Sequence, residues 1–180
     1  MIEPVAWRRD RLVLLDQTRL PVEERYLEFS HWPEVADAIR NLVVRGAPAI
    51  GVTAAFGAAL AALRSQATDF DGLLADLETA VKGLGATRPT AVNLFWALDR
   101  MKRALLAQKG RPVDEARSLL LAEAKRILEE DIAANQALGR HGATLVPRGA
   151  KILTHCNAGA LATAGYGTAL GVVRAAHAEG

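Results

Sequence analysis

The sequence has one cysteine, few aromatic residues and no large excess of positive or negative charge, and each of these features excludes a class of protein. Cys156 is the single cysteine among 180 residues, which excludes an intramolecular disulfide framework and a structural zinc site built on several cysteines. Aromatic residues make up 5% of the chain, and the three tryptophans are isolated from basic clusters. The sequence therefore offers no stacking platform for nucleic-acid bases.

The charge balance excludes a strong global field. The chain has 22 basic and 20 acidic residues and a formal net charge of +2, so nothing favours a nucleic acid or a membrane surface as partner. The distribution is uneven, because no acidic residue lies between Asp131 and Glu179 while four basic residues do: Arg140, Arg148, Lys151 and Arg174. Such a local excess fits an anionic ligand, and a solvated face explains it equally well.

Targeting and metal-binding patterns are also lacking. The first residues reach Arg8 and Arg9 without an apolar core, so no signal peptide is visible and a cytoplasmic location is expected. Three histidines, His31, His141 and His177, have no ligand spacing to a carboxylate or a cysteine. No metal site is expected.

The first 145 residues predict a mainly helical domain with a small antiparallel sheet near its N-terminus. Short β-type runs separated by turn residues lie between residues 5 and 29. The uncharged stretch Gly46–Leu63 approaches the length of a membrane span, but it is mostly alanine and glycine and predicts a buried helix instead. Apolar periodicity and capping residues predict helices at about 31–44, 49–64, 69–84, 90–109 and 112–142, with Asp69 and Thr90 as the N-caps of the third and fourth.

Residues 146–180 predict the start of a second, α/β domain. Lys151–Cys156 contains a short apolar strand core, followed by a glycine-rich turn and an alanine-rich helix to about Ala178. One such strand cannot close a sheet, because its backbone groups and both faces need neighbouring strands and helices. Either another polypeptide supplies them or the chain is a piece of a longer one, and we expect the second.

Cys156 is a candidate functional residue. It follows the predicted strand, and ligands of open α/β sheets bind beyond the carboxyl ends of strands. A helix N-terminus there would attract a phosphate or an oxyanion and lower the pKa of a thiol. A buried, inert cysteine is the equal alternative. The later glycines, Gly165, Gly167 and Gly171, miss the dinucleotide-binding spacing, which disfavours a nucleotide cofactor.

Two loops between predicted helices each carry an arginine. Arg45 precedes a glycine, and Arg88 precedes a proline. A guanidinium in such a loop can bind a phosphate with two hydrogen bonds, although an arginine near a helix C-terminus often only complements the helix dipole. Two such loops beside a glycine-rich turn favour an anionic small molecule as ligand.

Three segments together resemble the methylthioribose-1-phosphate isomerase family: Arg45–Gly51, Thr87–Asn93 and Thr154–Gly171. That family belongs to a superfamily shared with the regulatory subunits of eukaryotic translation initiation factor 2B and with ribose-1,5-bisphosphate isomerase. The order and the spacing of the segments both fit, and the resemblance spans nearly the whole chain.

The resemblance implies an aldose–ketose isomerase of methionine salvage, which converts 5-methylthioribose 1-phosphate to 5-methylthioribulose 1-phosphate. It implies a cytoplasmic homodimer without metal or nucleotide cofactor, with a helical N-terminal domain and a Rossmann-like C-terminal domain, of which residues 146–180 would be an incomplete part. Carried over by position, Arg45, Gly46, Ala47 and Arg88 would contact substrate, and Cys156 would be the catalytic cysteine. The family's catalytic aspartate would lie beyond Gly180, so this chain alone is expected to be inactive.

Two other functions stay open. One is a non-catalytic regulatory subunit of the initiation factor 2B type, which would bind nucleotides or sugar phosphates as an assembly module. Intact Arg45, Arg88 and Cys156 argue against it, because a module that only binds has no need of the thiol. The other is an isomerase of another phosphorylated pentose.

Overall fold

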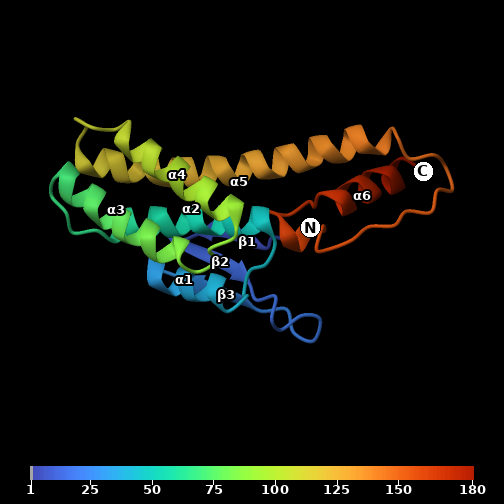
Figure 1. The fold of residues 1–180 in the computed structure, drawn as a ribbon, viewed down its shortest axis with the longest axis horizontal. Coiled ribbons are helices and arrows are strands. Elements are labelled where there is room, and N and C mark those ends of the chain that lie inside the picture. Colours follow the sequence, from blue (N-terminus) through green and yellow to red (C-terminus); the bar gives the residue numbers. More distant parts are fainter. Residues whose placement is uncertain (1) are drawn as a thin grey trace.

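A computed structural model describes residues 2–180 as an elongated helical bundle with a small sheet on its flank (Figure 1). The mainly helical class and the small antiparallel sheet are as predicted. The elements follow in the order β1 (Val5–Arg8), β2 (Arg11–Leu15), β3 (Tyr26–Phe29), α1 (Trp32–Arg40), α2 (Ala47–Arg64), α3 (Phe70–Gly85), α4 (Val92–Leu106), α5 (Val113–Ala143), the 3₁₀ turn η1 (Ala160–Ala162) and α6 (Ala169–Glu179).

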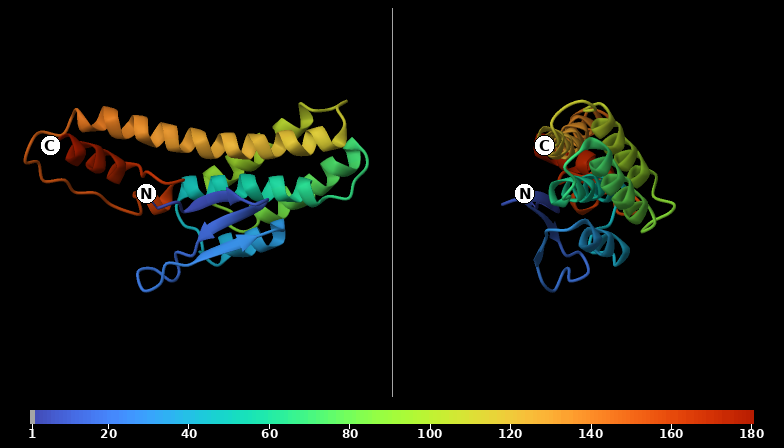
Figure 2. Two further views of the ribbon diagram at one scale, coloured as in Figure 1. Left: turned by 180° about the vertical axis from the view of Figure 1, so that it is seen from behind. Right: turned by 90° about the vertical axis from the view of Figure 1, so that its left-hand side faces the viewer.

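The sheet covers one side of α2. Its order is β1-β2-β3, with antiparallel pairing that sets Leu14 opposite both Val5 and Leu27. The central strand is buried over Leu12–Leu15. Trp7 of β1 stacks on Phe56 of α2 with ring centroids 5.4 Å apart, so the sheet is part of the core. Figure 2 shows the strands lying alongside α2.

Helix α2 is the centre of the bundle. Every residue from Ala49 to Ala62 is buried, and α1, α3, α4 and α5 all pack against the helix. Small residues permit this: a Cβ on Gly57 would lie 3.1 Å from a Leu84 methyl and 3.2 Å from a Val35 methyl. The helix is long and apolar enough to span a membrane by composition, yet 78% of that stretch is buried within the protein. The predicted buried helix is confirmed.

The start of α3 is as predicted and that of α4 is not. Asp69 caps α3 by accepting a hydrogen bond from the Gly72 N–H at 2.7 Å. Helix α4 has Ala91, not Thr90, as its N-cap. The Ala91 N–H donates to the Arg88 carbonyl at 3.0 Å, so Thr90 lies within that turn.

The strand predicted at 151–156 is wrong for this structure. Residues 151–157 are exposed and outside any strand, while helix α6 forms as expected. The segment runs past the end of α5 and back beside α6, along the outer edge of the molecule (Figure 2). A strand needs hydrogen-bonding neighbours, and no strand among residues 2–180 lies beside this segment.

Close packing joins α5 to α6. A Cβ on Gly142 would lie 2.5 Å from Val172 Cγ2, and one on Gly139 would lie 2.8 Å from the Tyr166 ring. These glycines, near which the long helix was expected to end, lie in its last turns and allow α6 to approach. This packing fixes α6 to the bundle, although the strand predicted before it at 151–156 is absent.

Candidate functional site

The turn before α2 leaves the N-terminus of this helix without a capping side chain. Gly46 is the N-cap of α2 with φ +101°, a conformation that glycine adopts at little cost. Its carbonyl accepts the Ile50 N–H at 2.9 Å and opens the helix. The first N–H groups of a helix have no acceptor within it, so the amide of the exposed residue Ala47 and the helix dipole favour an anion here.

Both predicted arginines lie at helix ends with uncommitted guanidinium groups. Arg45 is exposed and Arg88 is half-buried. Arg117, by contrast, donates to the carbonyls of Ala62 at 3.2 Å and Ser65 at 3.0 Å. Within residues 2–180 neither Arg45 nor Arg88 makes a comparable side-chain bond or an ion pair. Their charges remain available to a ligand.

The structure brings the first and second arginine segments together. A Cβ on Gly51 would lie 2.9 Å from the Asn93 carbonyl oxygen, so only glycine lets α4 begin this close to α2. The two segments line a cavity of about 450 Å³ with the middle of α5. Its walls are mostly apolar, with Val52, Trp96 and Ile127 among them.

The glycine-rich segment lies on the turn at Gly46. A Cβ on Gly46 would lie 2.4 Å from both the Cα and the carbonyl oxygen of Ala162, so η1 lies directly on this glycine. The loop is held internally by the Thr163 hydroxyl, which accepts the N–H groups of Gly165 at 3.2 Å and Gly167 at 3.0 Å. The third segment thus meets the first.

Cys156 precedes this ordered loop in an exposed position. The alternative of a buried, inert cysteine is therefore wrong for this structure. Two residues later, the Ala158 carbonyl accepts the Thr168 N–H at 2.9 Å and marks the start of the ordered loop. Cys156 has φ +69°, so the thiol sits at a bend rather than on a strand. Its expected catalytic role stays a prediction.

Sequence reasoning missed two polar residues beside the loop. Gln17, from the segment after β2, donates Nε2–H to the Leu161 carbonyl at 2.7 Å. Asp131 of α5 accepts the Ala164 N–H at 2.7 Å. Burial raises the pKa of the Asp131 carboxyl, and the Ala164 bond partly opposes that rise. Helical spacing offered a signal, because Asp131 lies four residues after the buried Ile127.

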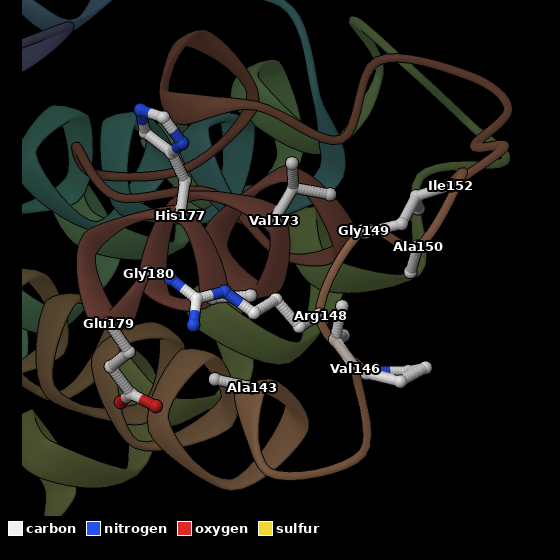
Figure 3. Close-up of a pocket in the computed structure, with 12 residues that line it drawn as sticks. Ala143, Val146, Arg148, Gly149, Ala150, Ile152, Val173, His177, Glu179 and Gly180 are labelled. Carbon is white, nitrogen blue, oxygen red and sulfur yellow. The ribbon is translucent and has the colours of Figure 1, made fainter.

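A further cavity lies away from these residues. It measures about 580 Å³ and lies between the segment Val146–Ile152 and the face of α6 that carries Val173 and His177 (Figure 3). None of the five predicted site residues lines it. Across residues 2–180, no group of three or more metal-ligating side chains could hold a metal ion.

The fold and the site define a class: a helical domain in which a glycine-capped helix N-terminus, with two arginines at neighbouring helix ends, meets a glycine-rich loop that follows a cysteine. The model of the initiation factor 2 subunit family matches residues 43–180. The chain belongs to this family.

Two curated relatives from different organisms have the same name. The methylthioribose-1-phosphate isomerase of Geobacter metallireducens is 56% identical over 98% of this chain, and that of Heliobacterium modesticaldum is 54% identical over 99%. The matches cover 51% and 52% of those proteins, so the chain spans about half the length of the curated relatives it matches.

Two solved structures share the fold. The 5-methylthioribose 1-phosphate isomerase of Pyrococcus horikoshii superposes with a TM-score of 0.93 at 45% identity, over 99% of this chain and 50% of that one. A protein described as translation initiation factor eIF-2B subunit delta of A. fulgidus superposes with a TM-score of 0.88, also at 45% identity, over 99% and 52%.

Proposed function

We propose that the protein is an aldose–ketose isomerase that converts 5-methylthioribose 1-phosphate to 5-methylthioribulose 1-phosphate. The observation that carries the proposal is the junction at Gly46, where a helix N-terminus beside Arg45 meets the loop that follows Cys156. The names of the curated relatives supply the substrate.

The chemistry explains what such a site must do. The phosphate of this substrate is bonded to the anomeric carbon, so the ring does not open as a free aldose does. An acid gives a proton to the ring oxygen, and the bond from that oxygen to C1 breaks. A hydrogen then moves from C2 to C1, and the C2 hydroxyl loses its proton to become the ketone. Phosphate stays on C1 throughout.

The residues of this chain would bind the substrate and stabilise the transfer. Arg45, Arg88 and the amides at Gly46 and Ala47 hold the phosphate, because a helix end and two guanidinium groups supply complementary charge. Cys156 stabilises or relays the hydrogen transfer in a site closed to water. We assign the role of proton donor to no residue of 2–180. Following the resemblance, we propose that the donor belongs to a Rossmann-like part.

The proposal includes the setting that the resemblance implies. The enzyme would work in methionine salvage, as a cytoplasmic homodimer, without metal or nucleotide cofactor. Light scattering of the natural gene product that contains these residues measures the mass of the assembly. A monomer at working concentration would contradict the dimer and leave the reaction untouched.

The test is an isomerisation assay on the natural gene product and two variants. Cys156→Ser is expected to lower kcat by about 100-fold or more with little change in KM, because a transition-state role spares ground-state binding. Arg45→Met is expected to raise KM. Arg40→Met is the matched control, since Arg40 ends α1 on an exposed surface and pairs with Asp37. An unchanged rate in Cys156→Ser would show that the thiol takes no part in the reaction.

A non-catalytic regulatory subunit is the second candidate. The likeness to the structure described as an initiation factor subunit favours it, because that protein shares the same fold at the same identity. The assay separates the two. A natural gene product that binds ribose phosphates but never converts them would support the regulatory subunit and reject the isomerase.

A further inference from the structure

Two polar side chains hold the glycine-rich loop from different elements. Gln17, which is 6% exposed, donates to the Leu161 carbonyl at 2.7 Å. Asp131 accepts the Ala164 N–H at 2.7 Å. The two bonds lie on either side of Ala162 in the sequence. They come from the segment after β2 and from α5, and β2 and α5 lie on opposite sides of α2 (Figure 1).

Gln17 also fixes the turn that precedes α2. Its backbone N–H donates to the Val43 carbonyl at 3.0 Å, so one residue bonds both the turn and the loop. The preceding Asp16 orders this segment, because its Oδ1 accepts the Thr18 N–H at 3.0 Å. The segment after β2 therefore does more than connect two strands, because Gln17 bonds both the chain just before Arg45 and the glycine-rich loop.

Asp131 acts on the other end of the loop. Its carboxylate lines the cavity between α2, α4 and α5 and reaches across to a backbone amide of the loop. Keeping a carboxylate in such a place costs desolvation, which an apolar residue of similar volume would avoid. What the carboxylate adds is a fixed position for Ala164, two residues from the Ala162 contact on Gly46.

We propose that Gln17 and Asp131 are positioning residues, which together hold the glycine-rich loop on the Gly46 turn and so set the distance between the phosphate-binding helix end and the thiol of Cys156. Both side chains would act through the loop backbone that they bond, at Leu161 and Ala164. The proposal rests on the proposed function for its catalytic consequence and on the hydrogen bonds alone for its structural one.

The structural consequence is tested by hydrogen exchange of the natural gene product. Gln17→Glu keeps the size and removes the donor, and Asp131→Leu keeps the size and removes the acceptor. Both variants are expected to speed exchange in residues 158–168 while the amides of α2 stay protected. Matched controls are Gln66→Glu and Glu129→Leu, which change exposed residues and should leave this loop as in the parent.

The catalytic consequence is tested in the natural gene product. A displaced loop is expected to lower kcat/KM by about 10- to 100-fold, because small misplacements of reacting groups are costly. Asp131→Asn retains an acceptor oxygen and is expected to keep most of the parent's kcat/KM. If the negative charge itself were needed, Asp131→Asn would be as impaired as Asp131→Leu. Each variant is compared at a temperature well below its own unfolding midpoint.

The outcomes are separable. Faster loop exchange with lower kcat/KM supports positioning. Unchanged exchange in residues 158–168 for both folded variants overturns it, and so does an Asp131→Asn variant as impaired as Asp131→Leu. If exchange rises in the variants but the parent protein never isomerises the substrate, the proposed function fails. The structural role of Gln17 and Asp131 in holding the loop is then still supported. If Asp131→Leu does not fold, Gln17→Glu alone decides.

Discussion

Helix α2 and the segment Lys151–Asn157 contain similar leucine and isoleucine side chains but end in opposite environments. Leu60 of α2 is fully buried, whereas Leu153 is 98% exposed. Four helices and the sheet surround α2, and all of them come from residues 2–143. No strand of the described chain pairs with the second segment. An apolar run becomes a stable element only where the chain also supplies its neighbours.

The largest expected effect comes from the same substitution in the two regions. Leu60→Ala should lower the free energy of unfolding by about 2–5 kcal/mol, because it leaves a cavity in the core. Leu153→Ala should change it by less than about 0.5 kcal/mol. Urea denaturation of both variants measures the difference. Equal losses would mean that Leu153 is packed in solution and would contradict the difference in burial between the two regions.

Gly46→Ala should have the next largest effect. The new Cβ would meet the Ala162 backbone at 2.4 Å, and φ is +101°. Gly110→Ala is the matched control, because its φ is +92° and nothing lies within 4 Å of the new Cβ. We expect about 1 kcal/mol for the control from backbone strain alone and about 2–3 kcal/mol for Gly46→Ala. Equal values from thermal unfolding would mean that the loop does not rest on Gly46.

Arg117→Met tests the far end of α2. Arg117 is 17% exposed and bonds three carbonyl groups at and just after the C-terminal end of α2, those of Ala62, Ser65 and Ala67. Its loss leaves these acceptors short of a donor and should cost about 1–2 kcal/mol. Arg111→Met is the control, because Arg111 only pairs with Glu115 on the surface and should cost less than about 0.5 kcal/mol. Denaturation midpoints decide between them.

The smallest effect is a pH dependence at Asp131. Burial raises the pKa of this carboxyl in the folded state. The folded protein therefore binds the proton more tightly than the unfolded chain, and stability falls as pH rises through this pKa. Asp131→Asn removes that fall. Its stability relative to the parent should increase with pH from about pH 4 and then level off. A flat difference would mean that the carboxyl is solvated.

The sequence predicted the helices well because their signals are local. Asp69 caps α3 as expected, and the glycines near residue 140 mark the end of α5. The strand at 151–156 failed because pairing depends on other segments, which no local pattern contains. The same limit hid Gln17, whose partner Leu161 lies 144 residues away.

The candidate site was predictable in composition and only partly in arrangement. The motifs identified Arg45, Arg88 and the glycine-rich loop, and the structure places the loop on Gly46 and α4 beside α2. The closeness of these segments depends on Gly46 and Gly51, where a Cβ would clash with distant backbone. Such contacts are properties of the packed fold and do not follow from spacing along the chain.

The most direct test is a crystal structure of the natural gene product, as the Cys156→Ser variant, with 5-methylthioribose 1-phosphate bound. We expect the phosphate at the N-terminus of α2, bonded to the amides at Gly46 and Ala47 and to the guanidinium groups of Arg45 and Arg88. A phosphate bound instead between α6 and the segment Val146–Ile152, with this helix end left to solvent, would contradict this expectation.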